Sequence, residues 1–480
     1  MSTFRFPHQE QHRFTKRASP LAVALLSALL LVLLVPATSV ATTGTLIITS
    51  DTTLTEDHDG GIVVAGDDIT LDCAGYEVRG PGFAGILLAG RTGVTVMNCR
   101  VTGFLHGVAL VGGAARNTLR GNTSYANSGA GFALDPARDN VFTANIAENN
   151  GGNGFQLVNS AGNVLSNNTT RGNHGTGGFA MAGSDGNAFI ANSTIANDAA
   201  GFHMIASNAN RYEHNVIEQN SLGVAFFDGS HDNVVVGNTA SGNRDHGFAL
   251  VRSPSNEFAG NTASRNGGAG LVLFAGSSSN RFIANTAREN VLEGFGTHDS
   301  SDNEFTNNTS NNNGVSGFVL FDGSSRNRLD RNTANGNASE GYSTHGSSRD
   351  NEFANNVASG NAHGFVLFGA DSNAFVDNTA NANKATGFTL IDGASSNRFE
   401  GNVANANVFV GYNVDASNGN DFTNNTGNAN AVGFRVGNGS SSNVVEGNTA
   451  RGNKQVDAVD DLTGTGNVWT NNNFGMTKGI

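Results

Sequence analysis

The chain has 480 residues, enough for two or three ordinary domains, but its composition argues against such a division. It contains 64 Gly and only 14% charged residues, as flexible linkers do, yet its 31 Phe recur at regular intervals and so exclude a linker. The net charge of −13 argues against nucleic-acid binding, which needs a basic face, and against attachment to an anionic membrane surface.

Residues 1–41 have the features of an export signal. A basic start is followed by an apolar run, 21–35, and then by the small residues Ser39 and Ala41 at the spacing that a signal peptidase needs. The run is shorter than the roughly 20 residues of a membrane span, and an uncleaved signal anchor is the alternative. We therefore expect an exported protein, periplasmic, secreted or at the cell surface, with no membrane span once the signal is removed.

The two cysteines, Cys73 and Cys99, lie 26 residues apart, close to the length of the repeat described below. An exported protein can keep a disulfide, and adjacent turns of a stacked repeat bring such residues within bridging distance. Two buried free thiols are the alternative. The spacing does not match a zinc site.

Three columns of asparagine define a repeat of about 23 residues. The first column has sixteen members at intervals of 22 to 24 residues. A second Asn follows each of them by five positions, and a third follows by five more in all but the last repeat. The first column comprises Asn117, Asn140, Asn163, Asn187, Asn210, Asn233, Asn256, Asn280, Asn303, Asn327, Asn351, Asn373, Asn397, Asn420, Asn443 and Asn467.

Apolar residues are equally regular between these columns. A large residue such as Phe258 or Phe282 stands two positions after the first Asn, and a small one such as Ala263 often stands two positions after the second. The third Asn is followed by Gly, a large apolar residue and often a Leu, as in residues 364–367. This alternation in three short segments predicts three strands per repeat.

One such repeat is too small to bury its apolar side alone, so successive repeats must stack and pair their strands in parallel, about 4.8 Å apart. Phe then lies on Phe, Ala supplies the small wall that a narrow core requires, and stacked Asn amides bond to one another. We expect Asn at the corners because it tolerates left-handed backbone angles. The sequence thus predicts an all-β fold, a single-stranded parallel β-helix with asparagine ladders.

We predict the β-helix over residues 69–474, with residues 42–68 as an N-terminal cap and residues 475–480 as a C-terminal tail. This division gives about 18 coils and a rod of roughly 85 Å. Asp457, Asp460 and Asp461 interrupt the pattern near its end, where charges protect an exposed sheet edge. We expect the rod to be a monomer.

The repeat N-x-F-x-x-N-T-A-x-x-N…G-F-x-L resembles that of the pectate-lyase-like superfamily of right-handed parallel β-helices. The opening segments 69–75 and 94–99 are similar, more narrowly, to those of NosD-type β-helix repeat proteins, and the resemblance covers about residues 62–474. It implies a right-handed coil. It also implies either work on polysaccharides along one long face or, as for NosD proteins, a periplasmic accessory role in the maturation of a copper enzyme.

Two departures from these relatives bear on function. With two Cys and five Met, the chain has no obvious set of soft ligands for copper. The pair Asp135-Pro136 resembles an alginate-epimerase motif only faintly, because Ala137 stands where that motif has His.

In one part of the chain, residues that break the repeat pattern are also polar or ionisable. In two alternate repeats the outward residue after G-F-x-L is His, the inward Leu is replaced by Thr, and Glu precedes the Gly, while two Asp lie beside or between the histidines. The candidate surface patch comprises Glu293, His298, Asp299, Asp322, Glu340 and His345.

This patch offers ligands for a metal ion or a sugar, but a solvated strip with tolerated polar replacements is the simpler interpretation. Its two histidines lie roughly 10 Å apart by backbone, so they would have to bend toward one shared ion. A series of aspartates that could bind calcium is spread over many coils. It comprises Asp228, Asp299, Asp322 and Asp392. No cofactor is therefore predicted, and calcium or a transition metal is the alternative.

Catalytic residues are not identified, because no Lys or Arg is placed to neutralise a uronate; Arg252 is the nearest basic residue in register. A long rigid wall suits a polymer better than a small molecule. The sequence thus predicts an exported carbohydrate-associated or cell-surface binding or scaffold protein, with a polysaccharide or another cell-envelope component as partner. The alternatives are a NosD-like accessory and a polysaccharide lyase or epimerase.

Overall fold

The computed structural model describes residues 43–480, so the predicted export signal at residues 1–41 lies outside the described residues. Between residues 43 and 480 the chain forms short strands and turns and no helix. This part of the chain accordingly has no helix that could cross a membrane.

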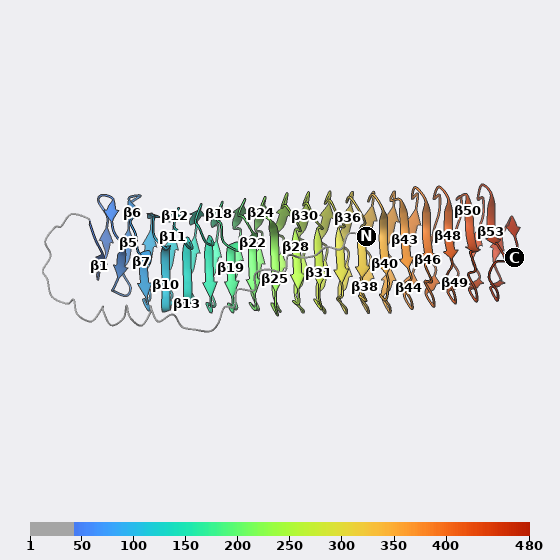
Figure 1. Cartoon of the computed structure of the whole chain (residues 1–480), viewed down its shortest axis with the longest axis horizontal. Coiled ribbons are helices and arrows are strands. Elements are labelled where there is room, and N and C mark those ends of the chain that lie inside the picture. The colour runs from blue at the N-terminus through green and yellow to red at the C-terminus, as the bar shows by residue number, and fades with distance from the viewer. Residues whose placement is uncertain (1–42) are drawn as a thin grey trace. The chain divides into compact units, whose positions relative to one another are not determined.

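Each turn of the chain contributes one strand to each of three parallel sheets, and successive turns stack along one axis (Figure 1). Sheet 1 collects the G-F-x-L strands, from β1 (Leu46–Ile48) to β56 (Thr477–Lys478). Sheet 2 collects the N-x-F strands, from β2 (Thr52–Thr53) to β54 (Val468–Thr470). The fold is the predicted right-handed parallel β-helix.

Sheet 3 collects the N-T-A strands, from β3 (His58–Asp59) to β45 (Thr379–Asn381). Beyond β45 it continues as single parallel bridges through Val403 and Thr426 to β52 (Thr449–Ala450). A typical turn consists of β34 (Phe295–His298) in sheet 1, β35 (Glu304–Thr306) in sheet 2 and β36 (Thr309–Asn311) in sheet 3.

The described coils number about 19, one more than the sequence predicts. The difference arises in the segment predicted as a cap, because β1, β2 and β3 there already complete a turn. β1 pairs in parallel with β4 (Ile62–Val64), just as later strands of sheet 1 pair with their successors.

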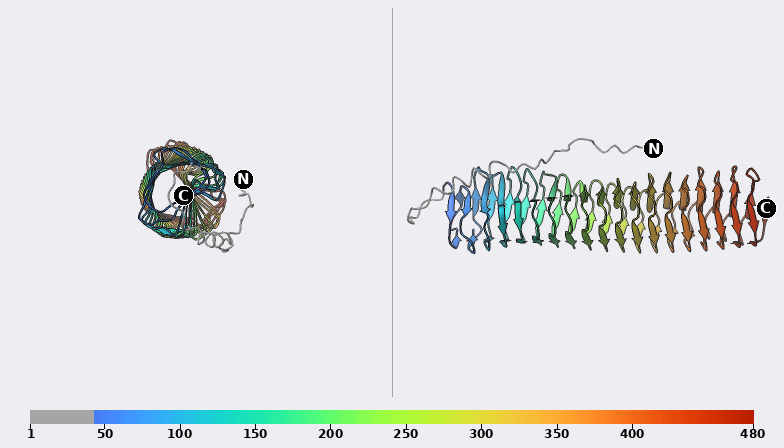
Figure 2. Two further views of the ribbon diagram at one scale, coloured as in Figure 1. Left: turned by 90° about the vertical axis from the view of Figure 1, so that its left-hand side faces the viewer. Right: turned by 90° about the horizontal axis from the view of Figure 1, so that it is seen from below.

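Equivalent residues lie directly above one another, as the period predicts. Phe258 pairs with Phe282 and Phe282 with Phe305 in sheet 2, and their buried rings stack with centroids 5.3 Å and 4.8 Å apart. Rings of sheet 1 meet them edge to face, as Phe295 meets Phe305 at 82°. Seen end-on, the coils lie over one another around a common axis (Figure 2). These rings, together with Leu and the small Ala of sheet 3, belong to one continuous buried core.

Buried asparagine amides connect each turn to the next. The side-chain oxygen of Asn332 accepts hydrogen bonds from the backbone N–H (2.8 Å) and the Nδ2 (3.0 Å) of Asn308. Its own Nδ2 donates to the carbonyl of Phe305 (2.8 Å) and to Oδ1 of Asn356 (3.1 Å). The same pattern repeats along all three columns, so a ladder side chain typically makes four hydrogen bonds while it is buried.

Left-handed backbone angles fall one residue before the ladder asparagines, which corrects our expectation that the asparagines themselves would adopt them. Arg331 precedes Asn332 with φ 55°, and Asn307 precedes Asn308 with φ 56°. This residue makes the bend that turns the following side chain inward, where its amide bonds across turns. The ladder Asn is therefore selected for its two-ended amide rather than for its backbone freedom.

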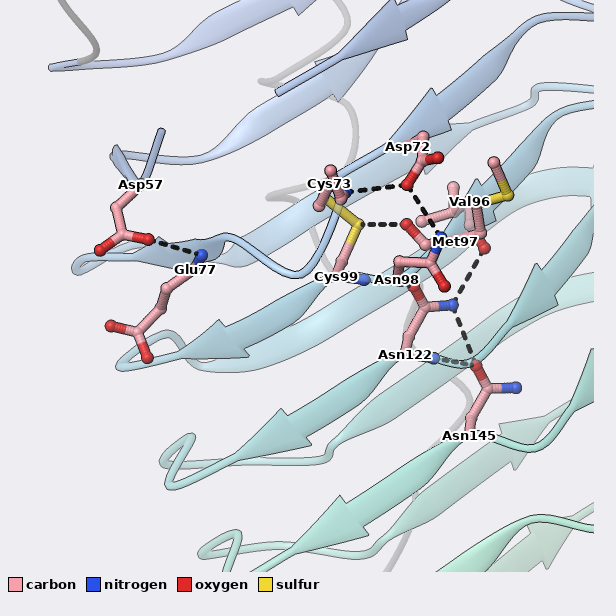
Figure 3. The surroundings of a disulfide bond; sticks show 11 residues. Asp57, Asp72, Cys73, Glu77, Val96, Met97, Asn98, Cys99, Asn122 and Asn145 are labelled. Carbon is pink, nitrogen blue, oxygen red and sulfur yellow. Dashed lines mark hydrogen bonds between the residues drawn. A yellow bond between two sulfur atoms is a disulfide. The ribbon is translucent and has the colours of Figure 1, made fainter. Parts of the chain in front are cut away.

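A disulfide between Cys73 and Cys99 lies at the N-terminal end of the second asparagine column (Figure 3). The N–H of Cys99 donates to Oδ1 of Asn122 (3.0 Å), just as the N–H of Asn122 donates to Oδ1 of Asn145 (3.0 Å). Cys99 thus occupies a ladder position. The disulfide thus joins two neighbouring turns at the N-terminal end of the second asparagine column.

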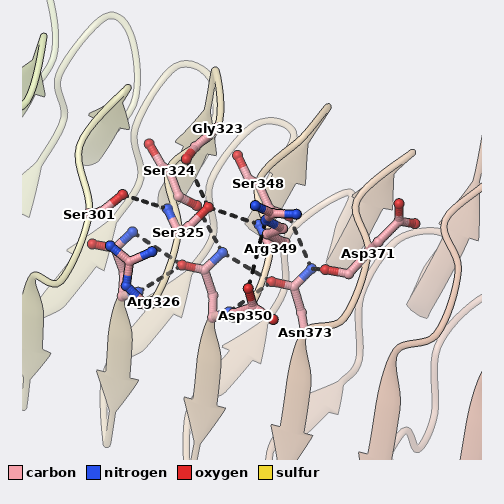
Figure 4. A network of polar contacts seen from close by, with 12 residues as sticks. Ser301, Gly323, Ser324, Ser325, Arg326, Ser348, Arg349, Asp350, Asp371 and Asn373 are labelled. Atoms are coloured by element: carbon pink, nitrogen blue, oxygen red, sulfur yellow. Dashed lines mark hydrogen bonds and ion pairs between the residues drawn. The ribbon is translucent and has the colours of Figure 1, made fainter.

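Serine forms further ladders at the corner between sheets 1 and 2 (Figure 4). In one of them, the N–H of Ser325 donates to Oγ of Ser301 (3.1 Å), and the N–H of Arg349 donates to Oγ of Ser325 (3.4 Å). Such bonds hold the corners of successive turns in register.

We predict that Asn332→Ala lowers the free energy of unfolding by about 3 kcal/mol, because the buried N–H and Nδ2 of Asn308 lose their shared acceptor. The control Asn418→Ala removes an exposed side chain with a single bond, to the N–H of Ser441, and should cost less than about 1 kcal/mol. Urea unfolding followed by circular dichroism measures both. Equal losses in the two variants would contradict the ladder's role.

Candidate functional site

Five aromatic and imidazole rings line the outer face of sheet 1 on five successive turns. They stand at the ends of β31 (Leu271–Phe274), β34, β37 (Phe318–Phe321), β40 (Glu340–His345) and β43 (His363–Phe368). We call this set the ring strip; it comprises Phe274, His298, Phe321, His345 and Phe368. All five side chains are half-buried.

The rings of the strip stack face to face along the rod. Centroid separations from Phe274 to Phe368 are 5.0, 5.3, 4.0 and 4.3 Å, with interplanar angles of 29°, 7°, 12° and 11°. Each inner ring therefore has both faces covered by its neighbours and presents its edge outward. The edges of aromatic rings carry partial positive charge, so this row favours electron-rich oxygen atoms over stacked sugar faces.

The structure brings three of the six predicted patch residues together at His298. Nε2 of His298 lies 3.8 Å from Oε1 of Glu293, and Nδ1 lies 3.8 Å from Oδ2 of Asp322. Asp322 is 73% exposed, whereas Glu293 is only 15% exposed. The imidazole thus lies between one buried and one solvated carboxylate.

Glu293 reaches His298 because Gly296 lies beneath its carboxylate. A Cβ at Gly296 would come within 2.7 Å of Glu293 Oε1, so a larger residue there would displace the acid. Burial raises the pKa of Glu293, but the imidazole of His298 beside it and the nearby His246 outweigh burial and leave that pKa lowered overall. Glu293 is therefore held as an ionised hydrogen-bond acceptor and is poorly suited to donate a proton.

The second acid–imidazole pair is arranged differently. Glu340 does not bond to His345; its carboxylate accepts hydrogen bonds from Ser316 (2.5 Å) and Ser339 (2.8 Å). Burial lowers the pKa of His345 to about 4, against the opposing effects of Glu340 and Asp322. Beside it, the buried hydroxyl of Ser343 has no hydrogen-bond partner among residues 43–480.

Asp299 and Asp322 follow the ring strip at a corner with left-handed backbone, φ 46° and 53°. Asp228 and Asp392 occupy the same corner on other turns, φ 49° and 57°. Because Asp tolerates this conformation, the corner itself accounts for the aspartate series. The series is therefore a structural feature and gives no evidence of a calcium site.

The two histidines cannot share one ion, because the ring of Phe321 is stacked between them. Across residues 43–480 no three His, Cys, Asp or Glu side chains gather as metal ligands. Arg252, the nearest base in register, is engaged by Asp228, with Nε 2.7 Å from its carboxylate oxygen. The geometry offers hydrogen-bond acceptors and ring edges, and the nearest base in register among residues 43–480 is already paired.

The predicted patch left out the aromatic members of the strip, Phe274, Phe321 and Phe368, although the sequence places them in the same outward column as the histidines. A large apolar residue at an outward position that is followed by His one turn later is the signal that identifies them. The sequence also did not predict a hollow of about 570 Å³ at the N-terminal turns, which is lined by Gly60, Arg79 and Gly80 among others. Arg79 there is bonded to Asp59 (2.6 Å), so its charge is already matched.

We predict that folding stability falls as the pH decreases from about 6.5 to about 4, in part because of His345. The unfolded chain takes up a proton on this imidazole below its ordinary pKa of 6.5, whereas the folded chain does so only near its lowered pKa of about 4. His345→Phe keeps the stack and removes the proton, so it should reduce this acid loss by on the order of 1–2 kcal/mol. NMR titration of His345 and urea unfolding at pH 7 and pH 4.5 measure both effects; titration near pH 6.5 would contradict the assignment.

Comparisons with known proteins agree on the fold. The family model "Right handed beta helix region" matches residues 39–194, 178–309 and 270–358. No curated protein matches the sequence.

Solved structures with similar coils include the mannuronan C-5 epimerase AlgE4 A-module of Azotobacter vinelandii (15% identity, 75% of this chain, 87% of that chain, TM-score 0.33). Others are the periplasmic alginate epimerase AlgG (12%, 72%, 76%, 0.33) and the DFA-IIIase from Arthrobacter chlorophenolicus A6 in complex with GF2 (12%, 64%, 83%, 0.37). At such identities and TM-scores, the similarity carries no argument about activity. The family match covers more than half of the chain, and the chain therefore belongs to the right-handed β-helix family.

Proposed function

We propose that this protein is a non-catalytic binding rod that works outside the cytoplasm and holds an extended neutral or amine-bearing glycan along the ring strip. The observation that carries the proposal is the strip itself, a row of ring edges and fixed acceptors across five successive turns. Four steps of about 4.8 Å give a length of roughly 19 Å, which suits several sugar units in line.

The acceptors beside the strip match the chemistry of sugar hydroxyls and amines. The carboxylates of Glu293 and Glu340 are held in place by His298 and by serines, so they need little reorganisation to accept further hydrogen bonds.

Charge selects the class of glycan. Carboxylates flank the strip, and Arg252, the nearest basic residue in register, is paired with Asp228. A uronate polymer would place its own carboxylates against these acids and pay desolvation without a cation to offset it. Neutral or amine-bearing chains avoid that repulsion.

Two features support a site of action outside the cytoplasm. The Cys73–Cys99 disulfide persists in oxidising compartments. The sequence of residues 1–41 has the basic, apolar and small-residue segments of an export signal.

Binding to immobilised glycans tests the proposal, with β-glucan as the neutral probe, chitosan oligosaccharides as the amine-bearing probe and polygalacturonate as the uronate. We expect the protein to bind one or both of the first two and not the third. Phe321→Ala interrupts the strip and should weaken binding roughly tenfold, about 1.4 kcal/mol. Phe409→Ala, which removes a 58% exposed ring at another corner, is the matched control and should bind normally.

Other outcomes would point to the alternative functions. Absence of binding to all three probes would end the glycan proposal. Unsaturated sugars released from polygalacturonate would indicate a lyase instead. Copper or calcium retained by the purified protein and lost in His298→Ala would favour an accessory role in metal handling.

A further inference from the structure

The outer face of sheet 3 changes character halfway along the rod. In its N-terminal half the outward positions include the charged residues Glu148, Arg171 and Glu218. From β36 to the bridge at Thr426, six turns present no charge at all. We call these outward residues the Thr/Asn array; it comprises Thr309, Asn311, Thr333, Asn335, Val357, Ser359, Thr379, Asn381, Val403, Asn405, Thr426 and Asn428.

One column of the array is β-branched on every turn. Thr is replaced only by Val, at Val357 and Val403, so the methyl group is kept even where the hydroxyl is not. β-Branched side chains are stiff at χ1, which fixes the direction of each methyl. None of the Thr hydroxyls in the array has a hydrogen-bond partner within residues 43–480, so they are available to solvent.

The second column is an outer asparagine ladder. The N–H of Asn335 donates to Oδ1 of Asn311 (3.1 Å), and the N–H of Ser359 donates to Oδ1 of Asn335 (3.0 Å). Two turns further, the N–H of Asn405 donates to Oδ1 of Asn381, and the N–H of Asn428 donates to Oδ1 of Asn405, at 2.8 Å each. These bonds hold the amide oxygens and leave the NH₂ groups as an ordered row of donors.

The two columns form a regular lattice, because sheet 3 keeps its register throughout. Thr309 pairs with Thr333, Thr333 with Val357, and Val357 with Thr379, and the bridges carry the same column on to Thr426. Neighbours along the rod are about 4.8 Å apart, and the two columns lie roughly 6.6 Å apart along each strand.

Such a lattice suits a ligand that is itself a flat, uncharged crystal. Soluble ligands are usually held in concave sites with a few convergent polar groups, and the array offers none of that convergence. Regularly spaced methyls instead order the first shell of water, and the fixed amides and hydroxyls bond to it at the same interval. The spacing along the rod is close to a repeat of the oxygen atoms in hexagonal ice.

We infer that the Thr/Asn array binds ice, through a layer of water that the array holds at the spacing of the crystal. A crystalline polysaccharide is a weaker match, because the array has no aromatic rings or carboxylates for sugars. The inference is independent of the ring strip, which lies on sheet 1.

Partition of the folded protein into slowly growing polycrystalline ice, together with inhibition of ice recrystallisation, tests the inference. The wild type should be enriched in ice and should keep crystals small. Thr333→Tyr and Thr379→Tyr place bulky side chains on the lattice and should lose both activities. Thr169→Tyr, on the same sheet but next to Glu148 and Arg171, is the matched control and should retain them; circular dichroism confirms that all variants are folded.

Exclusion of the wild type from ice would overturn the inference, as would equal loss in Thr169→Tyr. Binding to microcrystalline cellulose or chitin that Thr379→Tyr abolishes, without any ice affinity, would also overturn it and assign the array to a polysaccharide surface. Phe321→Ala should remain fully active on ice, so failure of the glycan proposal and failure of this one are separable.

Discussion

The buried side-chain amide bonded between turns is the interaction on which the rest of the structure depends. A ladder Asn accepts from the turn before and donates to the turn after, so a shift of register by one residue would break all of its bonds at once. The ring stacks of the core add to this constraint, because Phe282 fits between Phe258 and Phe305 only when the turns are aligned. Register therefore determines where every outward side chain lies.

Because the register is set by buried residues, only the outward faces of the sheets are left for binding a ligand. The interior is fully used by scaffold, so chemistry is left to outward columns, and each column is a row of side chains at one fixed interval. On sheet 1 the row is made of ring edges with carboxylates beside His298; on sheet 3 it is made of methyls and amides. Both rows repeat along the rod, as the two proposed ligands do, a glycan chain for the ring strip and ice for the Thr/Asn array.

The sequence was sufficient to predict the ladders, the stacked Phe and the three strands per turn, because those depend only on a period that every repeat shares. It could not predict that Glu293 would reach His298 while Glu340 turns to Ser316, since that choice depends on side-chain conformation and on the room above Gly296. It also assigned the left-handed angle to the ladder Asn, when the preceding residue adopts it. Periodicity locates a residue on a face of the rod, but the direction of an individual side chain depends on its conformation and on the residues around it.

Removal of a whole turn tests the central claim most directly. Deletion of residues 327–350 takes out one complete repeat and brings Asn351 into the place of Asn327, so all ladders can re-form. We predict a folded, cooperatively unfolding protein whose maximum dimension in small-angle X-ray scattering is about 5 Å shorter. Deletion of residues 327–338, half a turn, should abolish folding. If the half-turn deletion folds as well as the full-turn deletion, the ladders do not set the register of the turns.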